Sequence, residues 1–285
     1  MIGFVNVYKP SGMTSSNVVV KLRKTFHLDK IGHFGTLDPM ACGVLPIAIG
    51  KATRMFDYYL DKYKTYRARF QFGYITDTLD AEGEVLSRIE DIPTQQQVEL
   101  ALTQFLGKSM QVPPNFSAKL VNGVRAYQLA RNGETVELKP KEIEITKLEL
   151  ICFEDDWCDV DITCSSGTYI RSIARDLGYA VGSLCTMIGL ERTSSGVFNC
   201  ENAIKLEDLL LSGSIEDKLI GLETVFPNMP TIELNDNEYF KIRNGLTINN
   251  KYGISSEVFA KYNNQIVGVV SVVEDKIKLK TFLME

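Results

Sequence analysis

The sequence predicts an α+β protein with a mixed, largely antiparallel central sheet flanked by helices. Residues 63–73 alternate between apolar and polar side chains, which is typical of a half-buried antiparallel strand. Residues 169–181 instead repeat apolar side chains at helical spacing. At 285 residues and 45% hydrophobic, the chain can bury a large core. We expect a main domain over residues 1–228 and a small β-rich domain over 229–285.

The remaining elements follow from capping, turn and alternation signals. The expected strands are 1–7, 63–73, 84–89, 141–153, 157–164, 186–190, 258–262, 265–273 and 277–282. The expected helices are 18–26, capped by Ser15, Ser16 or Asn17, then 52–60, 94–106 with Thr94 as its cap, and 169–181. Residues 108–141 are rich in Pro-Pro and Asn-Gly pairs, so we expect an irregular insertion there, and residues 201–230 read as loop-rich.

Composition excludes several classes of protein. No run of eighteen apolar residues is present, which argues against a membrane-spanning helix. The six cysteines form no C-x-x-C pair and only two histidines accompany them, so we expect no metal site and a cytoplasmic protein with reduced thiols. The segment Gly50-Lys51-Ala52-Thr53 fails the P-loop spacing and lacks its magnesium-binding hydroxyl residue. We therefore expect no nucleotide cofactor.

Charge is distributed unevenly along the chain. The net charge is −5, yet residues 1–72 hold 11 Lys and Arg against 4 Asp and Glu, while the rest hold 20 against 32. A polyanion responds to a local basic surface rather than to the total charge. The charge alone is equally consistent with an ordinary solvated surface, so a nucleic-acid partner needs support from other features.

The loop at residues 32–46 contains the most informative carboxylate, Asp38. Surface loops are usually polar throughout, but this one carries Phe34, Leu37, Met40 and Val44. We therefore expect the loop to pack inward and to hold Asp38 at a partly dry position. Taken singly, an Asp-Pro pair is usually a turn former, and Tyr66 on a buried strand face is ordinarily a core residue. Arg171 lies near a helix start, where the dipole disfavours a cation, so it calls for a carboxylate partner.

Read together, these segments resemble the TruB family of tRNA pseudouridine synthases over residues 3 to about 200. The matching motifs occur in order: Tyr8-Lys9-Pro10-Ser11-Gly12-Met13-Thr14-Ser15, Gly32-His33-Phe34-Gly35-Thr36-Leu37-Asp38-Pro39, Gly43-Val44-Leu45-Pro46-Ile47, Gly50-Lys51-Ala52-Thr53, Lys64-Thr65-Tyr66, Thr76-Asp77-Thr78-Leu79-Asp80-Ala81-Glu82-Gly83, Ser117-Ala118-Lys119, Cys164-Ser165-Ser166-Gly167-Thr168-Tyr169-Ile170-Arg171 and Leu190-Glu191-Arg192-Thr193-Ser194-Ser195-Gly196-Val197-Phe198. The resemblance implies the pseudouridine synthase fold, with a reduced PUA-type RNA-binding domain at the C-terminus.

The resemblance also implies a reaction, the conversion of uridine 55 in the T-loop of tRNA to pseudouridine. Asp38 is then the catalytic carboxylate. It acts either as a nucleophile on C1′ or on the base ring, or by stabilising and deprotonating a ribosyl species, and the sequence does not choose among these routes. Arg171 pairs with Asp38 and lowers its pKa, and Tyr66 stacks on the uracil. No cofactor or metal is implied, because the reaction is an isomerisation.

Further residues are implied to contact RNA. His33 fills the space left by the flipped base, and Leu190 forms part of the floor of the pocket. Candidate contacts to phosphate or nucleotide are Lys9, Lys51, Lys64, Lys119 and Tyr169. The insertion at 108–141 is the candidate segment that clamps the T-loop.

Three alternatives remain open. A guide-RNA-dependent synthase shares such a core but is expected to carry basic tails and extensions. An RNA-folding module with vestigial catalytic residues is a second possibility, and a uracil-releasing glycosidase, which needs a second carboxylate and a water, is a third. We expect a stand-alone enzyme that acts on tRNA as a monomer, without guide RNA or membrane.

Overall fold

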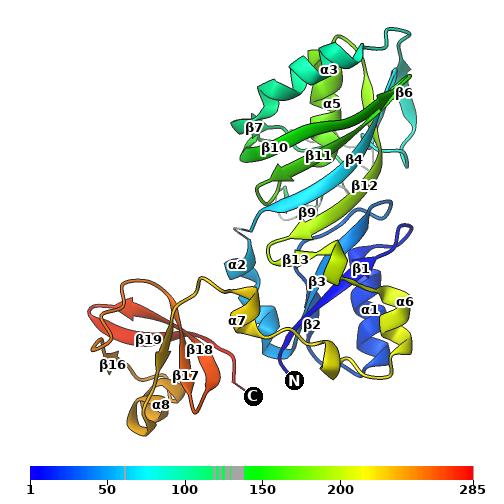
Figure 1. Cartoon of the computed structure of the whole chain (residues 1–285). Coiled ribbons are helices and arrows are strands. Elements are labelled where there is room, and N and C mark those ends of the chain that lie inside the picture. The colour runs from blue at the N-terminus through cyan, green and yellow to red at the C-terminus, as the bar shows by residue number, and fades with distance from the viewer. Residues whose placement is uncertain (61, 118–119, 122–123, 126–128, 130–137, 285) are drawn as a thin grey trace.

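The structure is a computed structural model of the chain, and it describes every residue except 61, 118–119, 122–123, 126–128, 130–137 and 285. A large sheet forms the body of the molecule, and a smaller sheet lies at its C-terminal end (Figure 1). This arrangement confirms the predicted α+β class with a mixed central sheet and a β-rich C-terminal part.

The large sheet has ten strands: β1 (Gly3–Lys9), β2 (Ile31–His33), β3 (Cys42–Ile49), β4 (Lys64–Phe72), β7 (Gly107–Gln111), β10 (Lys141–Glu154), β11 (Trp157–Cys164), β12 (Cys185–Ser195), β13 (Phe198–Asn199) and β14 (Ile204–Lys205). Eight of them run in the order β14-β1-β3-β12-β4-β11-β10-β7, with β2 beside β3 and β13 beside β12. Only the β1–β14 and β3–β12 pairs are parallel. The sheet is therefore largely antiparallel, as predicted.

The contact between β3 and β12 joins the two halves of this sheet. Glu191 and Arg192 pair with Cys42 and Gly43. The φ angle of Gly43 is +105°, and a Cβ atom there would lie 2.3 Å from the Arg192 carbonyl oxygen. Only glycine lets the two strands approach so closely. The loop that carries Asp38 enters the sheet at this junction.

Helices cover each half of the sheet separately. Helices α3 (Gln95–Leu102) and α5 (Ile170–Ala180) lie against one half, and α1 (Ser15–Thr25) and α6 (Leu206–Leu211) lie against the other (Figure 1). Each pair encloses its own apolar cluster, and the α3–α5 cluster includes Leu37, Ala41 and Tyr66. The segment around Asp38 is thus built into a packed core.

The shorter elements connect these parts. They are the 3-10 helices Gly50–Met55, Thr103–Phe105, Cys200–Asn202 and Glu216–Lys218, the helices α2 (Phe56–Tyr59) and α7 (Leu222–Val225), and the paired strands β5 (Tyr74–Thr76) with β6 (Val85–Arg88) and β8 (Leu120–Val121) with β9 (Val124–Arg125).

The smaller sheet has the strand order β15-β17-β18-β19-β16. Its elements are β15 (Thr231–Glu233), α8 (Asp236–Arg243), β16 (Ile248–Asn249), β17 (Val258–Tyr262), β18 (Gln265–Val273) and β19 (Lys276–Phe282). Phe259 and Val269 belong to the same apolar cluster as Phe4 and Phe34 of the body, so the two parts share a core. No helix among the described residues is long and apolar enough to cross a membrane.

Several predicted boundaries were wrong. Thr14, and not one of residues 15–17, caps α1, because its hydroxyl accepts from the Asn17 amide. The helix expected at 52–60 is a 3-10 helix followed by α2, and residues 108–111 of the supposed insertion belong to β7, which pairs with β10. The strand expected at 186–190 extends from 185 to 195, because it pairs with β4 along its length and with β3 at its end.

Other elements were missed altogether. The apolar run at 42–49 is β3, and the loop-rich region at 201–230 contains α6 and α7. Helix α8 begins with a capping box formed by Asn235 and Glu238. β3 forms because residues 42–49 pair with distant strands, which no local pattern reveals. The capping box of α8, in contrast, is a local signal that could have identified this helix.

Candidate active site

Asp38 lies in the loop between β2 and β3, at the junction of the two halves of the sheet. Around it, Phe34, Leu37 and Val44 are each at most 3% exposed. This confirms the prediction that the loop packs inward. The Asp38 side chain itself keeps 31% of its surface exposed, so its carboxylate can be reached from outside.

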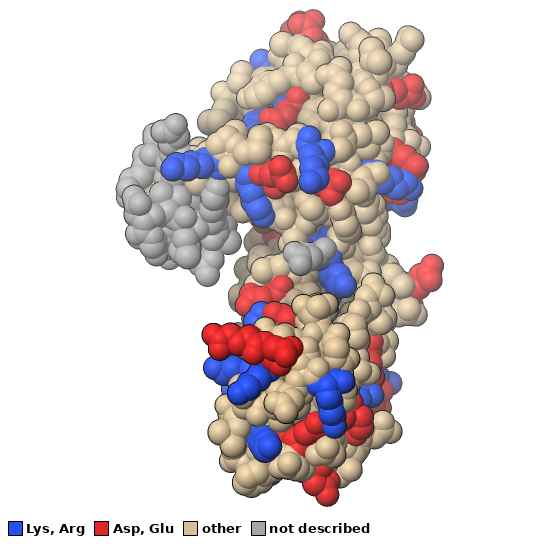
Figure 2. Space-filling view, turned by 90° about the vertical axis from the view of Figure 1, so that its left-hand side faces the viewer, with Lys and Arg blue, Asp and Glu red and all other residues tan. Residues whose placement is uncertain are grey.

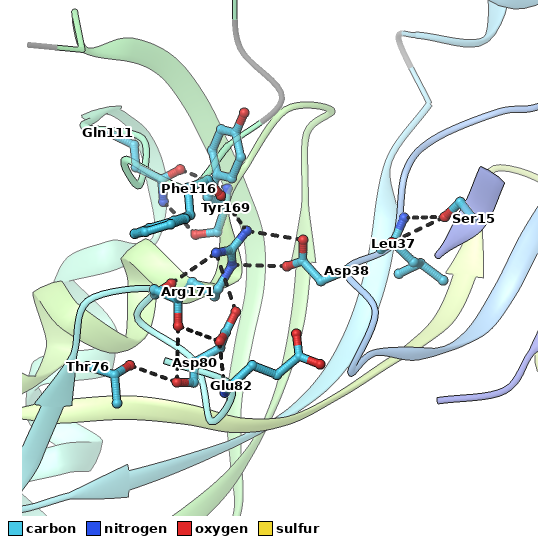
Figure 3. Close-up of polar contacts among 11 residues, drawn as sticks. Ser15, Leu37, Asp38, Thr76, Asp80, Glu82, Gln111, Phe116, Tyr169 and Arg171 are labelled. Atoms are coloured by element: carbon cyan, nitrogen blue, oxygen red, sulfur yellow. Dashed lines mark hydrogen bonds and ion pairs between the residues drawn. The ribbon is translucent and has the colours of Figure 1, made fainter. Parts of the chain in front are cut away.

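Arg171 binds the Asp38 carboxylate with both oxygens engaged (Figure 3). Arg171 Nε lies 3.0 Å from Asp38 Oδ2, and Nη2 donates to Oδ1 at 3.1 Å. Arg171 is the second residue of α5 and its side chain is only 7% exposed. The predicted ion pair between these residues is confirmed, and its forked geometry fixes the plane of the carboxylate.

Asp80 is a second carboxylate on the same arginine, and the sequence did not single it out. Asp80 Oδ2 lies 3.4 Å from Arg171 Nη1, which also donates to the Thr78 carbonyl at 2.9 Å. Thr78 Oγ1 and the Glu82 amide donate to Asp80 Oδ1. Asp80 belongs to the motif at 76–83, but spacing alone could not choose among its three acidic residues.

Burial and charge act on Asp38 in opposite directions. Burial raises the pKa of the Asp38 carboxyl, the Arg171 guanidinium lowers it, and Asp80 raises it again, with a net upward shift. Arg171 thus lowers the pKa of Asp38, as predicted, but desolvation outweighs the ion pair and the net shift is upward. Burial and the neighbouring Asp80 and Asp38 carboxylates also raise the pKa of Glu82.

Tyr66 lies on β4, opposite Arg192 of β12 and Ile162 of β11. Its side chain is 7% exposed. Burial raises the pKa of the Tyr66 hydroxyl, and the nearby Arg192 guanidinium opposes this shift. Leu190, two residues before Arg192, is partly buried against the same apolar cluster as Tyr66. Sequence reasoning did not single out Arg192, which is fully buried and donates to the carbonyls of Val44 and Gly35.

His33 ends β2 and pairs with Ile47 of β3. Its Nδ1 atom is buried and has no hydrogen-bond partner among the described residues. Burial, reinforced by the Arg192 charge, lowers the pKa of the imidazole. The ring is thus favoured in its neutral form, which suits stacking better than ion pairing.

The lysines proposed as phosphate contacts occupy different environments. The Lys9 side chain is fully buried, and its ammonium donates to the carbonyls of Pro10, Met13 and Pro39. Lys64 is 6% exposed and donates to the Lys62 carbonyl. Burial lowers the pKa of each to about 8. Lys9 therefore links two loops, and both ammonium groups bind backbone carbonyl oxygens.

The remaining predicted contacts lie elsewhere. Lys51 donates to the Met284 carbonyl and lies 4.3 Å from the centroid of the Phe282 ring, so it joins the body to the smaller sheet. Tyr169 caps α5, and the Gln111 side chain binds both its backbone amide and its carbonyl (Figure 3). Lys119 and part of the proposed clamp at 108–141 lie outside the described residues.

Charges of both signs are interspersed on the face shown in Figure 2, over the upper and lower parts of the molecule. This face has no continuous basic surface among the residues drawn in colour. The described residues also contain no group of three or more His, Cys, Asp and Glu side chains arranged to hold a metal ion.

The fold and the site together place a partly exposed carboxylate, held by a buried arginine, at the junction of the two halves of a mixed sheet. The fold resembles that of a chain in the crystal structure of a Cbf5-Nop10-Gar1 complex, with a TM-score of 0.74 and 24% identity over 99% of this chain and 85% of that one. A chain in the archaeal box H/ACA sRNP Nop10-Cbf5 complex gives 0.71 and 22% over 99% and 86%.

Sequence comparison identifies the family. Residues 23–170 match the model of the TruB family pseudouridylate synthase N-terminal domain. The chain is 40% identical to tRNA pseudouridine synthase B of Clostridium perfringens over the whole of both chains, and 37% identical to that of Ehrlichia chaffeensis over 98% of each. The chain belongs to the TruB family and is a pseudouridine synthase.

Proposed function

We propose that this protein isomerises uridine 55 in the T-loop of tRNA to pseudouridine, with Asp38 as the catalytic carboxylate. The observation that carries this proposal is the Asp38–Arg171 pair, in which a partly exposed carboxylate is held by a buried, forked guanidinium. The relatives in Clostridium perfringens and Ehrlichia chaffeensis bear the name tRNA pseudouridine synthase B, which supports tRNA as the substrate. Position 55 follows from the resemblance of the motifs.

The reaction rearranges bonds without adding or removing atoms. The C1′–N1 bond breaks, the uracil rotates, a C1′–C5 bond forms, and the proton on C5 is released while N1 gains one. Asp38 acts at the step that frees the base. It serves either as a nucleophile on C1′ or on the base ring, or it stabilises and deprotonates a ribosyl species. The apolar residues around Asp38 exclude water, which would otherwise hydrolyse a glycosyl intermediate.

The uridine must leave the folded T-loop before it can reach Asp38. Flipping costs a few kcal/mol, and stacking on aromatic side chains offsets part of it. Tyr66 and Leu190 belong to one apolar cluster beside Asp38, so they form the surface on which the uracil packs. The neutral His33 ring stacks on the neighbouring bases.

The phosphate contacts of the tRNA come from lysines with exposed ammonium groups. Our proposal leaves Lys9 and Lys64 out of this set, because both side chains are buried and their ammonium groups bind carbonyl oxygens. Lys119 stays a proposed contact, and the insertion at 108–141 stays the proposed clamp, with its two ends in β7 and β10. Residues 229–285 are proposed to form a small PUA-like RNA-binding domain, and the enzyme is proposed to work as a monomer without guide RNA or cofactor.

The experiment is tritium release from C5 of tritiated uridine in an unmodified tRNA transcript. We expect release by the wild type with no guide RNA, and none by Asp38→Asn, while the affinity of that variant for tRNA stays within a few fold. Asp161→Asn serves as the matched control, because Asp161 pairs with Arg67 at the sheet surface.

Either of two results would contradict the proposal. Substantial release by Asp38→Asn would show that another group starts the reaction. Binding of the transcript by wild type and variant without release would favour an RNA-folding module or a guide-dependent synthase. A tRNA with uridine 55 replaced by cytidine tests the position, since the proposal predicts no release above background from the remaining uridines.

A further inference from the structure

The segment at residues 9–15 binds the Asp38 loop directly through hydrogen bonds. Ser15 Oγ accepts from the Leu37 amide at 2.9 Å and lies 3.2 Å from the Leu37 carbonyl, to which it donates (Figure 3). Ser15 is 1% exposed. One buried hydroxyl thus binds both polar backbone groups of the residue that precedes Asp38.

The other side of Asp38 is held by the same segment. The Gly12 amide donates to the Pro39 carbonyl at 2.9 Å, and Ser11 Oγ donates to the Met40 carbonyl at 2.7 Å. The Lys9 ammonium also reaches the Pro39 carbonyl, at 3.3 Å. Residues 37, 39 and 40 are therefore all bound by residues 9–15, which we call the loop-holding segment.

Ser15 can do this because Thr14 serves as the helix cap. The Thr14 hydroxyl accepts from the Asn17 amide, so the hydroxyl of Ser15, the first residue of α1, is available to Leu37. The helix is anchored in turn, since Val18, Val19 and Leu22 are buried in the core of that half of the sheet. Ser15 therefore attaches the Asp38 loop to a rigid element.

We propose that Ser15 is a positioning residue for Asp38 and that the loop-holding segment keeps the Asp38 loop in its reactive geometry. Arg171 orients the carboxylate, while Ser15 orients the peptide unit from which the Asp38 side chain departs. A displacement of about 1 Å at a reacting group can cost about 100-fold in rate. The inference rests on the proposed function, because it presumes that Asp38 reacts.

The test compares Ser15→Ala with Ser183→Ala in single-turnover tritium release and in tRNA binding. Ser183 is a matched control, since it is 5% exposed and donates to the Asp91 carbonyl, in the turn between α5 and β12. We expect Ser15→Ala to lower the rate about 30- to 100-fold while the tRNA Kd stays within threefold. Ser183→Ala should leave both within threefold, and Ser15→Thr, which keeps a hydroxyl, should regain most of the rate.

A rate for Ser15→Ala within threefold of the wild type would overturn the inference, and so would an equal loss in Ser183→Ala. If Ser15→Ala does not fold, Ser11→Ala decides, because Ser11 is exposed and its loss removes only the bond to Met40. A rate reduced at least threefold at unchanged Kd would then support the role of the loop-holding segment, and an unchanged rate would overturn it.

Asp38→Asn in the same assay separates the two proposals. If Asp38→Asn remains active, the assignment of the catalytic residue fails. If Asp38→Asn is inactive while Ser15→Ala reacts like the wild type, only the positioning role of Ser15 fails.

Discussion

Asp80 and Arg171 form a buried ion pair behind the Asp38 carboxylate, with Asp80 Oδ2 3.4 Å from Arg171 Nη1. The side chains are 5% and 7% exposed. Nε and Nη2 of the same guanidinium face Asp38, so one arginine is shared between two carboxylates (Figure 3). Asp80 thereby fixes the guanidinium in place before substrate arrives, and Arg171 needs no rearrangement to hold Asp38.

Asp80→Asn should reduce turnover at least 10-fold and lower the free energy of unfolding by about 1–3 kcal/mol, because it leaves a buried guanidinium with one carboxylate. Removing the Asp80 charge also removes one cause of the raised Asp38 pKa. The acidic limb of the pH–rate profile should therefore move to lower pH. Turnover and chemical denaturation measure these effects. Asp161→Asn, at an exposed pair, should cost at most about 1 kcal/mol.

Arg171→Lys should reduce turnover at least about 100-fold, although it conserves the charge. The guanidinium binds both Asp38 oxygens and the carbonyls of Thr78 and Phe116, and a single ammonium cannot reproduce that fork. Single-turnover kinetics at saturating tRNA measure the loss. Arg175→Lys, one turn further along α5, is the control and should react within a few fold of the wild type. Equal rates in both variants would show that the fork is not required.

Lys9 should make the stability of the protein depend on pH in the alkaline range. Burial lowers the pKa of Lys9 to about 8 in the folded protein, against about 10.4 in the unfolded chain. Between these values the unfolded chain binds more protons, so the stability contributed by this group rises with pH. Below pH 8 the cost of the buried charge is present in full.

Comparison with Lys9→Met isolates this effect, because Lys64 is common to both proteins. The free energy of unfolding of the wild type relative to the variant should increase by about 3 kcal/mol from pH 7 to pH 10.5, as measured in urea. A difference that stays constant over this range would show that the Lys9 pKa is not lowered.

Lys119→Ala should weaken tRNA binding and reduce the slope of log Kd against log salt by about one unit, as expected for the loss of one phosphate contact. Lys9→Met should leave that slope unchanged, because the Lys9 ammonium is buried against carbonyl oxygens. Fluorescence anisotropy with labelled tRNA at four or more salt concentrations measures both. Equal slopes for wild type and Lys119→Ala would remove Lys119 from the phosphate contacts.

Local patterns predicted those elements whose signals lie within one segment. The alternation at 63–73 corresponds to β4, and the helical spacing at 169–181 corresponds to α5. β3 and the far end of β12 were missed, because a continuous apolar run or a polar strand end becomes a strand only when a distant partner is present. The buried state of Lys9 was missed for the same reason, since its acceptors include Pro39, thirty residues away.

The sequence by itself determined the family, the catalytic candidate Asp38 and its pairing with Arg171, because ordered motifs and a cation misplaced at a helix start are local features. The tertiary structure alone decided that Asp80 shares Arg171, that Lys9 and Lys64 are withdrawn from the surface, and that Ser15 holds the Asp38 loop. The physical reason is that burial, desolvation and hydrogen-bond geometry depend on atoms brought together from distant segments, and no single segment encodes them.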